Sequence, residues 1–254
     1  MKNETDQSVG TLAVPFMGSS RVTTQPTVNG TRNPLVALYS APSCPAGSSM
    51  RVRFWKPGDA LYHFTPTRGC TAASSMNFYI AGMTAHTTYS LQQDLMKGPM
   101  VTVGPLLSFT TGNPTISVSP SILAPAQPPT SQTEGTLLFA GLDNINAAID
   151  LTGKLVWYYS GDGAYITRTE TGGNMFLTVQ PVQNPNLTRQ QNSEKQLLRE
   201  IDLAGNTILE TNAARIGELL GYPVNLIHHD IFRLPNGNLV FLTATERMAD
   251  QGSG

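Results

Sequence analysis

The chain has 254 residues, with 16 Lys+Arg against 17 Asp+Glu, so its formal net charge is −1. A chain this close to neutral has no strong electrostatic attraction to nucleic acid or to an anionic membrane, and we expect neither as a partner. Charged residues make up only 13% of the chain, and 23 glycines and 18 prolines interrupt it too often for long helices. The composition therefore predicts an all-β protein.

Further classes are disfavoured by local sequence. No run approaches the ~20 apolar residues that a membrane span needs. The start MKNETDQSVGTLAVPF has no apolar core after its charges, so no signal peptide is visible in this chain. With two cysteines, Cys44 and Cys70, the chain does not fit a disulfide-dense scaffold or a Cys-rich zinc module. We expect no metal and no cofactor.

Beyond an N-terminal extension over residues 1–29, five short segments carry strand signals. Their ranges are 34–40, 50–56, 76–80, 87–91 and 106–110. In the second, apolar residues alternate with Arg51 and Arg53, as in a strand with one buried face. Strands at this density predict an immunoglobulin- or fibronectin-like β-sandwich over residues 30–112. The segment Met83–Tyr89 (MTAHTTY) resembles the tyrosine corner of such sandwiches, which is a structural device.

A Pro-rich linker follows at residues 113–134, with five prolines among 22 residues. The charge balance changes across it. Residues 1–134 hold 8 Lys+Arg and 5 Asp+Glu, whereas residues 135–254 hold 8 and 12. We therefore expect two domains, divided at this linker.

Residues 135–254 contain repeated hairpin signals. Asp150–Trp157 and Asp202–Leu209 share an Asp, a Gly turn and a β run, and Thr169–Leu177 and Arg233–Phe241 form a second pair. The Gly-Asn of the second pair recurs after 64 residues, which fits four short strands per repeat and predicts β-propeller blades. These 120 residues suffice for about two blades, whereas a closed propeller needs roughly 4–8. We therefore expect an incomplete propeller and favour truncation over closure by partner chains.

The residues that could carry chemistry gather in Asn225–Phe241 (NLIHHDIFRLPNGNLVF). His228 and His229 are half of the four histidines of the chain, and they precede Asp230. Since successive side chains of a strand point to opposite faces, the two imidazoles should not face the same cavity. The structural alternative is that one histidine packs between blades while Asp230 ties down a turn.

The motif His-His-Asp-Ile-x-x-Leu-Pro-Asn-Gly-Asn at residues 228–238 resembles that of the bacterial aryl sulfate sulfotransferases, the arylsulfotransferase family. Four other segments are similar to that family in the same order: 33–38, 81–89, 109–112 and 153–159. The resemblance covers nearly all of residues 30–245 and corresponds to the N-terminal portion of the family.

The resemblance implies a six-bladed propeller enzyme that transfers a sulfuryl group from a phenolic sulfate ester to a phenol. It does so without a nucleotide donor, by a ping-pong mechanism through a covalent sulfohistidine. His229 best matches the first channel histidine of the family, which assists rather than attacks, and His228 is the alternate register. The nucleophilic histidine and the sulfate-binding arginine would lie in later blades, so we expect no turnover by these 254 residues alone.

Other residues near the motif have structural interpretations. Asp230 is expected to orient the start of the strand rather than to act as a base, because a carboxylate in the channel would repel the sulfate. Arg168 and Arg233 are expected at the surface or at blade edges. Substrate-binding residues stay unassigned.

The family works in the periplasm, so the resemblance implies a periplasmic or secreted protein. Cys44 and Cys70 would then be paired and close a loop of about 26 residues, and the alternative is two buried thiols. The implied partners are a phenolic sulfate donor and a phenol acceptor, and a homodimer is compatible with the resemblance.

A different class also fits, namely a non-catalytic extracellular propeller with a sandwich domain that serves as a binding or scaffold protein. It would lack the convergent histidines and arginines that an enzyme needs in its channel. A quinone-dependent dehydrogenase propeller is disfavoured, because we find no calcium-ligand or Trp-docking motifs. Trp55 and Trp157 are expected to pack on strands, and His63 and His86 to be exposed.

Overall fold

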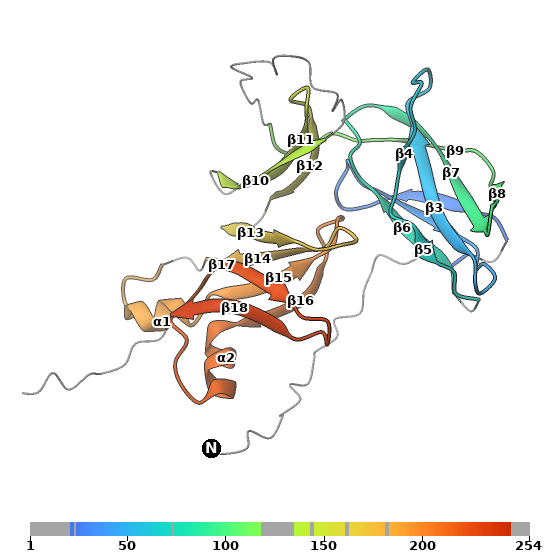
Figure 1. Cartoon of the computed structure of the whole chain (residues 1–254). Helices are drawn as coiled ribbons and strands as arrows, with labels where there is room; N and C mark the ends of the chain where they lie inside the picture. The colour runs from blue at the N-terminus through green and yellow to red at the C-terminus, as the bar shows by residue number, and fades with distance from the viewer. Residues whose placement is uncertain are drawn as a thin grey trace, which may run out of the picture.

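The computed structural model describes residues 21–22, 24–72, 74–117, 135–142, 145–160, 163–180 and 183–244 (Figure 1). The N-terminal strands are β1 (Thr27–Gly30), β2 (Ala37–Ala41), β3 (Ser49–Trp55), β4 (His63–Phe64), β5 (Arg68–Gly69), β6 (Met76–Ile80), β7 (Thr88–Lys97), β8 (Met100–Val103) and β9 (Leu107–Thr110). The later elements are β10 (Thr136–Leu142), β11 (Ile145–Asp150), β12 (Leu155–Ser160), β13 (Ala164–Thr169), β14 (Met175–Val179), α1 (Arg189–Ser193), β15 (Leu197–Ile201), β16 (Thr207–Asn212), α2 (Ala213–Leu220), β17 (Leu226–Arg233) and β18 (Leu239–Ala244). The described residues are all-β apart from two short helices, so the fold class predicted from the composition is confirmed.

The N-terminal strands form two antiparallel sheets. One has the order β1-β2-β6, and in the other β3 pairs with β4, β5 and β7, while β7 also pairs with β8 and β9. The five segments predicted as strands correspond to β2, β3, β6, β7 and β9. In β3, Met50, Val52 and Phe54 are buried and the arginines between them are not, as the alternation predicts. The first strand begins at Thr27, three residues before the expected boundary at residue 30.

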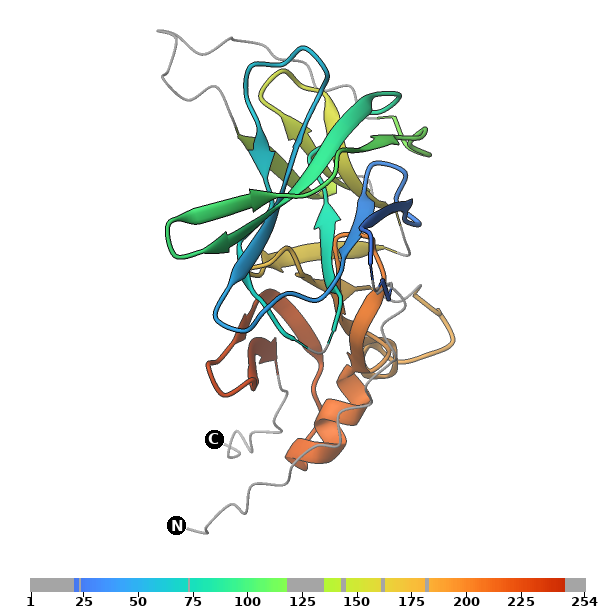
Figure 2. The same ribbon diagram turned by 90° about the vertical axis from the view of Figure 1, so that its right-hand side faces the viewer.

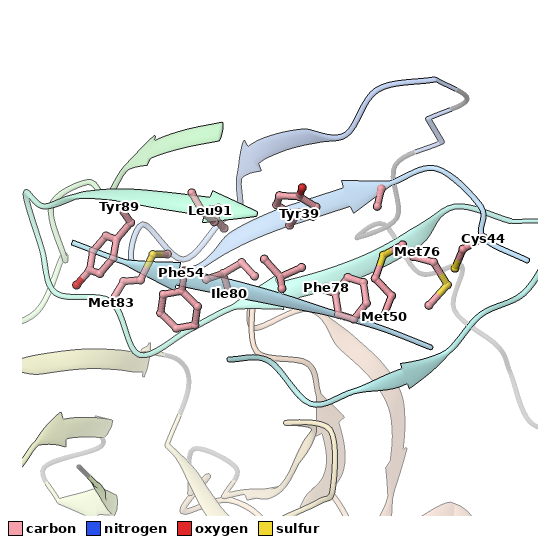
Figure 3. Close-up of a cluster of buried hydrophobic side chains, with 13 residues drawn as sticks. Tyr39, Cys44, Met50, Phe54, Met76, Phe78, Ile80, Met83, Tyr89 and Leu91 are labelled. Carbon is pink, nitrogen blue, oxygen red and sulfur yellow. The ribbon is translucent and has the colours of Figure 1, made fainter. Parts of the chain in front are cut away.

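The two N-terminal sheets share one hydrophobic core, to which β2 and β6 contribute from one sheet and β3 and β7 from the other (Figure 3). Its largest members include Tyr39, Phe54, Phe78 and Tyr89. A disulfide joins Cys44 to Cys70 beside this core, with their Cα atoms 5.3 Å apart, so the predicted pairing is confirmed.

The tyrosine corner is also present. The Tyr89 side chain is buried, and its hydroxyl accepts the backbone N–H of Thr84 at 3.0 Å. His86 lies exposed in this turn with φ 50°, a left-handed conformation that is uncommon outside glycine. The phenol therefore ties β7 to the turn that precedes it.

Residues 135–244 form three consecutive sheets, with the orders β10-β11-β12, β13-β14-β15-β16 and β17-β18. Their four Gly turns share one hydrogen-bond pattern: the first residue donates to the C=O four positions on, and the glycine N–H donates back to the first residue. The glycines of these turns have φ between 82° and 97°, a backbone conformation that is strained for residues with a side chain. The four predicted hairpins are thereby confirmed.

The 64-residue recurrence predicts that segments 165–211 and 228–254 share one strand arrangement, and the described residues show how each segment begins. Each segment begins with a hairpin of the same turn type, β13-β14 and β17-β18. Residues 245–254 lie outside the described residues, as do residues 118–134 of the linker. At the start of the linker, the backbone N–H of Thr115 donates to the Tyr158 hydroxyl of β12 at 3.1 Å.

Two helices interrupt the strands, and the composition argument did not predict them. In α1, the Thr188 side chain accepts a hydrogen bond from the Gln191 N–H, and the Gln191 side chain accepts one from the Thr188 N–H. This reciprocal pair is a capping box. In α2, Asn212 caps the N-terminus and Gly221 ends the helix with φ 74°. Each helix lies singly between strands, so neither forms the helical hairpin that would contradict consecutive β-blades.

The first strands of the three sheets, β10, β13 and β17, lie next to one another. Two buried side-chain amides join neighbouring sheets there. Asn146 donates to the C=O of Ala164 at 2.7 Å and accepts the N–H of Ile166 at 3.0 Å. Gln196 donates to the C=O of Ile227 and accepts the N–H of the same residue, both at 2.6 Å. We call these two side chains the amide staples.

The N-terminal sheets pack directly against the later ones (Figure 2). Leu35 and Val36 are fully buried among residues of β11, β12 and β13, and the Asn33 amide donates to the C=O of Tyr158 at 2.9 Å. The Tyr79 hydroxyl donates to buried Asp202 at 2.7 Å. Burial and this carboxylate raise the pKa of Tyr79, so the phenol stays a donor.

Replacing both Cys44 and Cys70 with alanine should lower the free energy of unfolding by about 3 kcal/mol, because the crosslink restricts a loop of about 26 residues in the unfolded chain. Chemical denaturation measures the loss. Dithiothreitol should reproduce it in the wild type and leave the double variant unchanged. A wild type that does not respond to the reductant would show that the thiols are unpaired in solution.

Asn146→Leu should cost about 3 kcal/mol of unfolding free energy, because it leaves a buried N–H and a buried C=O of β13 without partners. Gln190→Leu, on the exposed side of α1, is the matched control and should change stability by about 0.5 kcal/mol or less. Equal denaturation midpoints for the two variants would show that the Asn146 hydrogen bonds do not stabilise the fold.

Candidate functional site

His228 and His229 lie on β17, where the strand departs from regular pairing. His228 pairs with Leu242 and Ile231 pairs with Phe241, so His229 and Asp230 have no residue opposite them and form a bulge. His229 has φ 67°, in the left-handed region. The backbone of β17 is therefore locally strained at the second histidine.

The bulge brings the two imidazoles together. Their ring centroids are 4.4 Å apart and the rings meet edge to face at 84°. The prediction that strand alternation separates them is wrong here, because alternation requires an uninterrupted ladder and the bulge breaks it. The ring of His228 is half-buried, and among the described residues its Nδ1 has no hydrogen-bond partner, whereas His229 is exposed.

Asp230 connects the bulge to the neighbouring sheet. Arg168 of β13 binds both carboxylate oxygens, Nε to Oδ1 at 2.8 Å and Nη2 to Oδ2 at 2.5 Å. Oδ1 also accepts the N–H of Ile231 at 2.8 Å. Asp230 thus orients the strand, as predicted. Arg168 joins two sheets while remaining partly exposed.

The ion pair fixes the charge of both partners. The hydrogen bonds from Arg168 hold the pKa of Asp230 below its ordinary value, and those to Asp230 raise the pKa of Arg168. The carboxylate is therefore ionised at neutral pH, with its charge balanced by the guanidinium. An anion approaching this site meets a neutral pair rather than an unpaired aspartate.

A cleft of about 430 Å³ opens at this pair. It is lined by residues of the three adjacent first strands, namely Leu138, Ile166, Thr167, Arg168, Thr169 and Asp230. Asp230 is the residue through which the cleft adjoins the histidine bulge. Hydroxyls, the Arg168–Asp230 ion pair and an apolar wall meet in this cleft.

The other residues considered from the sequence have structural positions. Arg233 bridges to Glu200 at 2.5 Å and to Glu170 at 3.6 Å. Trp157 is buried and donates to the C=O of Leu203 at 2.7 Å, while Trp55 is half-buried against Tyr62. His63 and His86 are exposed, as predicted.

A larger cleft, of about 750 Å³, lies between the N-terminal sheets and the β13–β16 sheet. Its lining is rich in threonine and serine and includes Arg68, but it contains no histidine and no cysteine. It therefore offers no imidazole of the kind found on β17.

Two absences within the described residues bear on the class of site. No three His, Cys, Asp or Glu side chains gather there in a way that could hold a metal ion. Neither of the two described helices has the length and apolar character needed to cross a membrane.

Sequence reasoning missed Arg168 as a partner of the motif, and a signal for it exists. Arg168 and Asp230 are 62 residues apart, close to the 64-residue recurrence of the Gly-Asn turns. In a repeated architecture, residues about one repeat apart lie side by side in neighbouring units. The repeat length could therefore have paired these two side chains.

Together, the fold and the site describe an all-β protein whose consecutive sheets gather histidine, arginine and aspartate along their first strands. The family model for arylsulfotransferase (ASST) matches residues 124–254, slightly more than half of the chain. The chain therefore belongs to the arylsulfotransferase family. No curated protein matches it in a sequence comparison.

Arg168→Gln should raise the pKa of Asp230 toward the ordinary value of 3.8, because the donors that favour its ionised form are removed. Because the pKa of Asp230 is lowered in the folded state, its ionisation stabilises the fold at pH values above the ordinary pKa. This contribution is lost as the pH falls through the lowered pKa. Carboxyl ¹³C titration of Asp230 checks the shift, and an unchanged midpoint would contradict the assigned cause.

Proposed function

We propose that this chain contributes the first part of an aryl-sulfate sulfotransferase, which moves a sulfuryl group from a phenolic sulfate ester to a phenol without a nucleotide donor. The observation that carries the proposal is the pair of adjoining imidazoles in the β17 bulge, beside the Arg168–Asp230 cleft. Family membership supports the reaction class.

The proposed domain plan has a β-sandwich at residues 30–112, a linker at 113–134 and the first blades of a six-bladed propeller from residue 135. The shared core of the two N-terminal sheets supports the sandwich. Contact between the first strands β10, β13 and β17 supports the propeller, in which such strands surround a central channel.

The proposed reaction has two halves. In the first, a histidine nitrogen from a later blade attacks sulfur, the bond from sulfur to the aryl oxygen breaks, and the departing oxygen takes a proton from His229. In the second, the acceptor phenol oxygen attacks the same sulfur, the sulfur–nitrogen bond breaks, and the phenol proton passes to His229. Such acid–base assistance typically contributes ~10²–10⁴-fold.

The arrangement on β17 suits His229 for this role. Its exposure leaves the ring accessible to a substrate, whereas the neighbouring His228 is half-buried. Asp230 is committed to Arg168 and to the backbone, so it is not placed to act as the base. His228 is the alternate candidate.

We also propose a periplasmic or secreted location. Structural disulfides persist in oxidising compartments, and the Cys44–Cys70 bond fits one.

In a protein that joins this chain to the later blades, His229→Ala or His229→Asn should lower transfer from 4-nitrophenyl sulfate to a phenol by about 10²-fold or more, because the leaving phenolate loses its proton donor. Release of 4-nitrophenol measures the rate. His86→Ala, an exposed histidine in the tyrosine-corner turn, is the matched control and should keep wild-type rates.

Two results would change the assignment. Wild-type rates in the His229 variants together with a loss in His228→Ala would transfer the role to His228. Full activity in variants of both histidines would refute the catalytic assignment and favour the non-catalytic binding or scaffold protein.

A further inference from the structure

The conformation of the β17 bulge decides where both imidazoles lie. The hydrogen-bond ladder between β17 and β18 does not by itself determine that conformation. Pairing is regular at His228–Leu242 and again at Ile231–Phe241, but the two residues between have no partners across the hairpin. His229 also adopts φ 67° without being a glycine. A strained backbone of this kind persists only where surrounding contacts hold it.

The contacts that hold it converge on Asp230. Its Oδ1 accepts the N–H of Ile231, the residue at which regular pairing resumes. Arg168 contacts both oxygens of the same carboxylate from the neighbouring sheet. A two-point contact between guanidinium and carboxylate fixes the rotation of the carboxylate as well as its position.

The guanidinium is itself held in place. Arg168 follows a bulge in β13, where Ile166 pairs with Leu177 and Arg168 with Phe176. Its guanidinium carbon lies 5.3 Å from the centroid of the Phe232 ring on β17. Arg168 therefore contacts β17 through both the carboxylate and an aromatic face.

We infer that Arg168 is a positioning residue for the histidine pair: its two-point contact with Asp230 holds the β17 bulge in the conformation that brings His228 and His229 together. The catalytic significance of this role rests on the proposed function, whereas the geometry is measurable without turnover. The pair is partly exposed, with side chains 37% and 46% accessible, so breaking it buries no unpaired charge and the fold should survive.

The test is an NMR measurement on the isotope-labelled chain. In the wild type, protons of the two imidazole rings should show a nuclear Overhauser effect, since the ring centroids are 4.4 Å apart. In Arg168→Gln this effect should fall below detection, and the amide resonance of Ile231 should shift. Arg168→Lys, which keeps the charge but not the two-point contact, should retain a weakened effect.

Arg199→Gln is the matched control. It removes an arginine–carboxylate pair of the same chemistry, Arg199–Glu210 at 2.6 Å, within the β15–β16 hairpin. The effect between the histidine rings should persist in this variant.

An undiminished effect in folded Arg168→Gln would overturn the inference, because the strand would then hold its own bulge. If that variant does not fold, Asp230→Asn decides: its side-chain oxygen can still accept the Ile231 N–H, but the ion pair is gone. Loss of the effect in Asp230→Asn supports positioning by Arg168, and its retention refutes it. The transfer assay of the His229 variants tests the proposed function separately, so the two can fail independently.

Discussion

Within the described residues, the three sheets of 135–244 share no ladder hydrogen bonds with one another, so side chains must hold each first strand against the next. The amide staples meet this constraint. A carboxamide carries both a donor and an acceptor, and Asn146 and Gln196 each use them on a backbone C=O and N–H of the next first strand. Asn146 lies on β11, the second strand of its sheet, whereas Gln196 directly precedes β15, the third strand of its sheet, so the same chemistry is reached from two positions. The Arg168–Asp230 pair is a further contact between sheets, made between charged groups at the surface.

The same boundary between sheets creates the site. Register shifts occur in all three first strands, β10, β13 and β17, where each pairs with the second strand of its sheet. Bulges redirect side chains, and they are over-represented beside functional sites. In β17 the bulge turns two successive imidazoles toward each other, and in β13 Arg168 directly follows the bulge. The polar groups are therefore gathered by irregularities of the strands rather than by the strands themselves.

The difference between what could and could not be predicted follows from this. Strands and Gly turns are local, and the glycines at 153, 173, 205 and 237 occupy positions that require positive φ, so the hairpins were predictable. The helix caps Thr188–Gln191 and Asn212–Gly221 are equally local signals, but the glycine- and proline-rich composition favours strands over helices. The β17 bulge depends on how two strands pair, and no glycine marks it. The alternation of side chains along a strand therefore predicts the wrong orientation for His228 and His229, whose placement decides the site.

The N-terminal sheets support the sheet that supplies Arg168. Val36 belongs to the same buried cluster as Ile166, which lies two residues before Arg168 on β13. Tyr79 reaches Asp202 in the β15–β16 turn, where the Asn206 backbone and side chain bind the same carboxylate. The N-terminal sheets thus pack against the sheet that supplies Arg168, at its first strand and at a distal turn. Because Arg168 in turn contacts the histidine bulge, the part of the chain without catalytic candidates still supports the strand on which the site depends.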